Sequence, residues 1–130
     1  MPQPLKDIEE RIELLKMTLG MFAPSEPVPV ADEIVQLGEE IFEHALIAAG
    51  ETPAPGSASE ERLLALHAQR QRADAGLAPL AATCRTLLDL HRAVTASPYD
   101  SEAGPRLLAA AETVAALYSA VATRLPGTAR

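Results

Sequence analysis

The residues best suited to chemistry lie in one acidic stretch, Glu39-Glu40-Ile41-Phe42-Glu43-His44. Glu40 and His44 are four residues apart, so on a helix they share a face and could offer two ligands to one metal ion. A di-iron bundle needs a Glu three residues before a His on two helices, and the residue three before His44 is Ile41. We therefore expect no metal and no cofactor. Glu40 and His44 are the candidate ligands of an alternative, a ligand- or metal-sensing helical bundle.

Glu39, Glu40 and Glu43 also form an EExxE stretch. It resembles the acidic motif of the MazG-like nucleotide pyrophosphohydrolases, which are small all-helical proteins. In that family a later ExxD pair completes a magnesium site, but the residues three positions after Glu60 and Glu61 are leucines here. The resemblance would imply a divalent-metal nucleotide hydrolase with an incomplete motif, and this is a second alternative.

Nucleophilic catalysis is not indicated elsewhere in the chain. Cys84 and His91 lie seven residues apart, which separates their Cα atoms by about 10.5 Å on a straight helix. No nucleophile, base and orienting acid are grouped along the sequence, and no glycine-rich phosphate loop is present. We expect no catalytic residues, and a protein that is not an enzyme.

Composition predicts helices and a single domain. The chain has 130 residues, 48% of them hydrophobic but only 3% aromatic, whereas strands draw on aromatic and β-branched residues. Residues 1–61 contain 3 basic and 13 acidic side chains, and residues 62–130 contain 8 and 5. The two halves should attract each other. With a net charge of −7 and no basic run, the chain is not expected to bind nucleic acid.

The sequence predicts a cytoplasmic location. Cys84 is the single cysteine, so no disulfide can form within the chain, and a reducing compartment is the default. The first residues lack the apolar stretch of a signal peptide. The longest late uncharged run, Thr113 to Thr123, has 11 residues, fewer than the roughly 20 that span a bilayer. We expect no contact with a membrane.

Residues 1–22 should form a helix like those of coiled coils. Its apolar positions are spaced by three and four residues and form one narrow seam, made of Leu5, Ile8, Ile12, Leu15, Leu19 and Phe22. Because so short a seam cannot hold an isolated pair of helices together, it must pack against the rest of the domain or a second copy. We expect these six residues to contribute to the interface of a homodimer.

The remaining segments predict a helical body over residues 30–125. Helices are expected at about 30–49, 59–96 and 105–124, separated by joints rich in proline or glycine. Gly76 and Pro79 interrupt the third segment, and an interior proline costs a helix about 3 kcal/mol. The fold class is therefore all-α, a four- or five-helix bundle with antiparallel neighbouring helices and a kink or break near Gly76–Pro79.

A single polar residue interrupts the apolar stripe of that third segment. Arg70 could pair locally with Asp74, or it could cross to a carboxylate of the acidic second helix or of a second subunit. Together these patterns favour a non-enzymatic interaction module, an adaptor, regulator or accessory subunit that binds an unidentified protein partner and forms a dimer.

Overall fold

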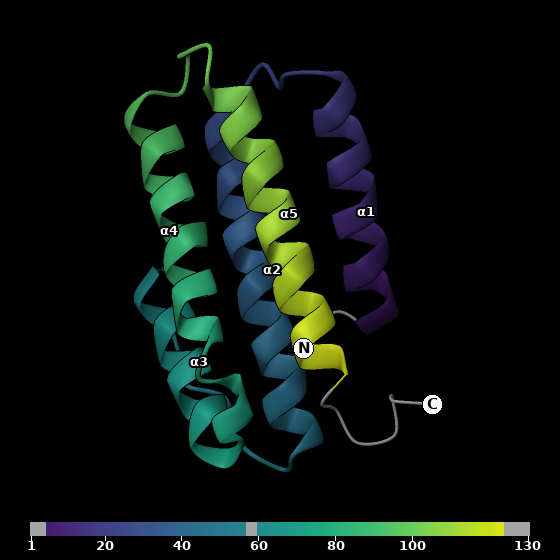
Figure 1. The fold of residues 1–130 in the computed structure, drawn as a ribbon, viewed down its shortest axis with the longest axis vertical. Coiled ribbons are helices and arrows are strands. Elements are labelled where there is room, and N and C mark those ends of the chain that lie inside the picture. The colour runs from purple at the N-terminus through teal and green to yellow at the C-terminus, as the bar shows by residue number, and fades with distance from the viewer. Residues whose placement is uncertain (1–4, 57–59, 124–130) are drawn as a thin grey trace.

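The computed structural model, which describes residues 5–56 and 60–123, is a bundle of five α-helices (Figure 1). They are α1 (Leu5–Met21), α2 (Pro27–Ala48), α3 (Glu60–Ala73), α4 (Leu80–Ala96) and α5 (Ala103–Ala122). Strands are absent from the described residues. The predicted all-α bundle is confirmed. None of the described helices is long and apolar enough to cross a bilayer.

The break predicted in the third segment is present. α3 ends at Ala73, a 3₁₀ turn, η1, occupies Ala75–Leu77, and α4 begins at Leu80. The Asp74 side chain accepts a hydrogen bond from the backbone N–H of Gly76 at 3.0 Å and so caps this turn. Pro79 occupies the N-cap position of α4, where a missing N–H leaves no hydrogen bond unmade. The break divides the predicted third helix into α3 and α4, so the bundle has five helices rather than four.

The ends of α2 show where sequence signals were informative. The helix begins at Pro27 rather than at about residue 30, because the first N–H groups of a helix have no intrahelical partner and prolines are tolerated there. At the other end, Gly50 has a φ of 78°, and the N–H of Glu51 donates to the carbonyl of Leu46 at 2.8 Å. This left-handed glycine ends the helix as expected.

α2 lies at the centre of the bundle and contacts the four other helices. Its buried residues include Ile34, Leu37, Ile41 and Phe42, which are fully inaccessible. A Cβ added at Gly38 would lie 3.3 Å from Leu87 Cδ2, so α4 approaches the α2 backbone closely at this glycine. The absence of a side chain is what permits that approach.

The direction of the helices follows from the contacts between them. α1 with α2, α3 with α4, and α4 with α5 are antiparallel, as expected for helices joined by short connections (Figure 1). α2 and α3 run in the same direction (Figure 1), because the described part of the joint between them, residues 49–56, runs back along α3. Gln69 holds that joint, accepting a hydrogen bond from the Ala54 N–H and donating one to the Thr52 carbonyl, both at 2.8 Å.

α1 forms one edge of the bundle and packs on α5 and α2, away from α3 and α4 (Figure 1). Ile8, Ile12 and Leu19 of its predicted seam are buried, and Leu15 is half-buried against the same core. Phe22 follows the last residue of the helix and is 65% exposed, because the chain turns there toward α2. The side chain of Leu5 lies outside the described residues.

Candidate functional site

The acidic stretch on α2 is engaged by an arginine at the start of α3. Arg62 Nη1 donates to Glu39 Oε1 at 2.8 Å and to Glu43 Oε1 at 2.9 Å, and its Nε donates to the carbonyl of Ala54 at 3.2 Å. The Glu39 side chain is only 1% exposed, and Arg62 and Glu43 are 14% and 19% exposed. This cluster neutralises a buried carboxylate and holds α3 against α2.

The charges of this cluster support one another. Burial would lower the pKa of the Arg62 guanidinium, but the hydrogen bonds that it donates to Glu39 and Glu43, together with their negative charges, outweigh burial and raise that pKa. Two carboxylates one helical turn apart therefore share one guanidinium. Both carboxylates are thus in contact with a cation of the protein itself.

Glu40, between these two in sequence, interacts with a different helix. Its Oε2 lies 3.8 Å from Arg11 Nη1 on α1, while Arg11 Nη2 lies 2.8 Å from Glu33 Oε2. Glu40 Oε2 is buried and has no hydrogen-bond partner within the described structure. The three carboxylates of the EExxE stretch thus face two separate cations on two sides of α2.

This division also bears on the metal candidates Glu40 and His44. Glu40 is buried on the α1 side, and His44 is half-buried. Over residues 5–56 and 60–123, no group of three or more His, Cys, Asp or Glu side chains is placed to hold a metal ion. A pair of ligands alone does not make a structural or catalytic metal site.

The other candidate residues make structural contacts. His67 is buried, and its Nε2 donates to the carbonyl of Leu77 at 3.0 Å, which ties α3 to the 3₁₀ turn that ends the break. Its ring meets Phe42 edge-on, with centroids 5.6 Å apart. His91 Nε2 lies 2.7 Å from Asp32 Oδ1 and links α4 to α2.

Cys84 is equally unsuited to catalysis. It is fully buried in the core, and that burial raises the pKa of its thiol to about 12. A nucleophilic cysteine needs the opposite, a thiolate stabilised by a nearby positive group.

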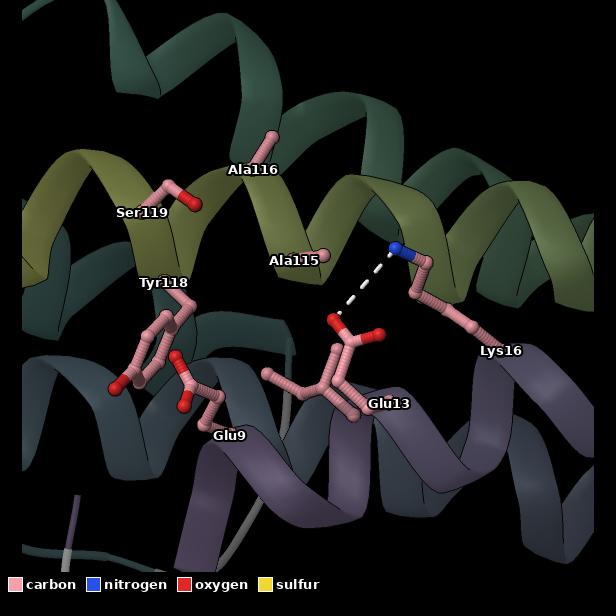
Figure 2. Close-up of a pocket in the computed structure, with 8 residues that line it drawn as sticks. Glu9, Glu13, Lys16, Ala115, Ala116, Tyr118 and Ser119 are labelled. Carbon is pink, nitrogen blue, oxygen red and sulfur yellow. Dashed lines mark ion pairs between the residues drawn. The ribbon is translucent and has the colours of Figure 1, made fainter. Parts of the chain in front are cut away.

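A groove of about 220 Å³ lies between α1 and α5 (Figure 2). The α5 side presents small side chains, Ala115, Ala116 and Ser119, and the α1 side presents Glu9, Glu13 and Lys16. Lys16 Nζ lies 3.7 Å from Glu13 Oε1. Burial, together with the charge and hydrogen bond of Glu9, raises the pKa of Tyr118 on the α5 wall. The groove is open and acidic, and it borders the exposed side of α1.

Three large apolar side chains lie on that exposed side of α1. Leu14, Met17 and Met21, here called the outer stripe, are 58%, 60% and 67% exposed. They are spaced by three and four residues, so they share one face of α1, and it lies opposite the face that buries Ile8 and Ile12. The second half of α1 therefore has two apolar faces, of which its own bundle covers one.

The sequence contains a signal for this stripe. Leu14, Met17 and Met21 repeat with the same spacing as the seam of buried residues on α1, at positions more than a quarter of a turn away from it. Arg62 had no comparable signal, since its crossing to α2 depends on how the two helices are rotated.

Arg70, the residue expected to pair or cross, is buried, and its Nε has no hydrogen-bond partner in the described part of the chain.

Comparison with protein-family models, with curated proteins and with solved structures finds no match to this chain.

Proposed function

We propose that this chain is a non-enzymatic helical interaction module that acts through protein–protein contacts, with the outer stripe of α1 as its contact surface. One observation carries the proposal: the second half of α1 is apolar on two opposite faces, and Leu14, Met17 and Met21 on the outer face are all more than half exposed. An amphipathic helix on the surface of a single domain needs one apolar face only. A second apolar face is typical of a helix that packs against its own domain on one side and against another protein on the other.

The composition of the outer stripe supports this function. The chain contains three methionines, and two of them, Met17 and Met21, lie in this stripe. Methionine is flexible and polarizable and is common at surfaces that adapt to a partner. Leu14 and Met21 are separated by about 10.5 Å along the helix, which matches the i, i+3, i+7 anchors of helix-to-helix recognition.

The polar residues favour this proposal over the two alternatives, a divalent-metal nucleotide hydrolase and a ligand- or metal-sensing bundle. Glu39 and Glu43 are occupied by Arg62, and Glu40 lies beside Arg11 on the other side of α2. A hydrolase would need these carboxylates on one metal ion. An adaptor, regulator or accessory subunit needs no such site. A cytoplasmic location, expected from the single cysteine, belongs to the same proposal.

The proposal includes the homodimer expected from the seam of α1, as a dimer that exchanges α1 between its two subunits. A single chain already buries Ile8, Ile12 and Leu19. Exchange of α1 between two subunits would bury the same seam in the same groove, and the joint that follows α1 could act as the hinge.

Paired surface variants test the proposed function. Met17→Asp places a charge in the outer stripe, and Ile47→Asp is a matched control, because Ile47 is a 51% exposed apolar residue on α2. Light scattering gives the mass in solution, affinity capture gives the bound proteins, and circular dichroism checks the fold. We expect Met17→Asp to stay folded and to lose a bound protein that Ile47→Asp retains, whereas a dimer formed by exchange of α1 should persist in both variants. If both variants keep every contact of the wild type, the outer stripe is not the contact surface.

A further inference from the structure

The charges beside the outer stripe indicate which partner it suits. Asp7 and Glu10 precede Leu14 on the same side of α1, and Glu13 flanks Met17 on the side of α5. All three carboxylates are exposed, and Glu13 remains 65% exposed despite its contact with Lys16. The outer face of α1 therefore has an acidic first half and an apolar second half.

A second copy of this chain would complement that face poorly. It would bring the same three carboxylates, and Lys6 is the one basic residue that the described part of the outer face adds. Arg11 is directed inward and lies 2.8 Å from Glu33. Residues 1–61 as a whole have 13 acidic and 3 basic side chains. Like charges across an interface oppose association, and opposite charges select and steer the partner.

We propose that the outer face of α1 binds a basic amphipathic helix of another protein. The apolar side of that helix packs on Leu14, Met17 and Met21, and its Lys or Arg residues lie against Glu10 and Glu13. The inference rests on the proposed function and specifies its partner. From Asp7 to Met21 the face is about 21 Å long, so it accommodates a partner helix of about four turns.

Fluorescence anisotropy with two designed peptides tests this proposal. Each peptide has about 18 residues, enough to cover the face, with leucines spaced by three and four residues. One carries lysines on its polar side, and the other has glutamates at the same positions. The proteins are the wild type, Glu10→Lys/Glu13→Lys, and the control Glu61→Lys/Asp89→Lys. The control has the same net charge change at exposed positions on α3 and α4.

We expect the basic peptide to bind the wild type at least about tenfold more tightly than the acidic peptide, and added salt to reduce that difference. Glu10→Lys/Glu13→Lys should abolish or reverse the preference, and Glu61→Lys/Asp89→Lys should retain it. Equal loss in both variants would mean that the peptide senses net charge only, which overturns the inference.

The failures of the two proposals are distinguishable. If neither peptide binds and light scattering shows a wild-type dimer that Met17→Asp dissociates, a second copy occupies the outer stripe. In that case the interaction function stands and the basic-helix inference is wrong. If neither peptide binds, the wild type is monomeric and Met17→Asp loses no captured protein, both proposals are wrong.

Discussion

Replacement of Arg62 by methionine is the change whose effect on stability follows most directly from the contacts. Methionine keeps much of the aliphatic length but removes the guanidinium that lies 2.8 Å from Glu39, whose side chain is 1% exposed. Removal of one partner from a buried ion pair costs about 3 to 5 kcal/mol. Because Arg62 and Glu43 retain 14% and 19% exposure, we expect the lower end, about 3 kcal/mol.

That loss converts into a measurable change of melting temperature. At about 2.1 cal/mol/K per residue, a chain of this length unfolds with an entropy of about 0.27 kcal/mol/K, so Arg62→Met should lower Tm by about 11 °C. Thermal unfolding followed by circular dichroism measures it. Arg85→Met, at an exposed position on α4, should change the free energy of unfolding by less than about 0.5 kcal/mol.

A double variant separates the charge effect from lost packing. Arg62→Met/Glu39→Gln removes the uncompensated carboxylate, so it should be more stable than Arg62→Met alone by about 1 kcal/mol. If Arg62→Met unfolds within about 1 kcal/mol of the wild type, the cluster on α2 does not hold α3 in place, and its carboxylates are free for another role.

Three further predictions concern the core and the thiol. Gly38→Val should destabilise by about 1 to 3 kcal/mol through crowding, whereas Gly20→Ala, with open space around it, should stabilise by about 0.5 kcal/mol; urea unfolding measures both. Ile12→Ala should cost about 2 to 5 kcal/mol and Met17→Ala less than about 0.5 kcal/mol in the same assay, and equal costs would contradict the assignment of the two faces. Burial raises the pKa of Cys84 from 9.0 to about 12, so the folded thiol should not react with Ellman's reagent at pH 8 and should react on unfolding. Because the folded pKa is the higher one, the stability contributed at Cys84 is complete below pH 9 and is lost as the pH rises toward 12, a loss that Cys84→Ala should not show.

Local signals in the sequence were sufficient for most of the fold. The spacing of Ile8, Ile12 and Leu19 identified the buried face of α1, and Gly50 identified the end of α2. Gly76 and Pro79 identified the break that separates α3 from α4. Each of these features depends on the backbone preferences of one residue or on the period of one helix, so it can be read without knowledge of the neighbouring helices.

The polar contacts between helices could not be predicted in the same way. Charge balance indicated that the two halves attract each other, but not that Arg62 would reach Glu39 and Glu43. That contact requires α2 and α3 to be parallel, and their direction depends on the path of the joint that Gln69 holds. Which arginine contacts Glu39 and Glu43 is thus decided by how the helices are arranged in space. The spacing of residues within one helix does not report that arrangement.

Methyl NMR of the protein labelled with ¹³C at its methionine methyl groups tests the role of the outer stripe most directly. Met17 and Met21 are the two labelled residues of α1, and Met17→Leu and Met21→Leu assign their signals. On titration with the basic peptide, we expect both signals to shift together and to saturate at the affinity found by anisotropy, with smaller shifts for the acidic peptide. Binding of the basic peptide without a change in either signal would place the contact surface elsewhere and contradict the proposed function.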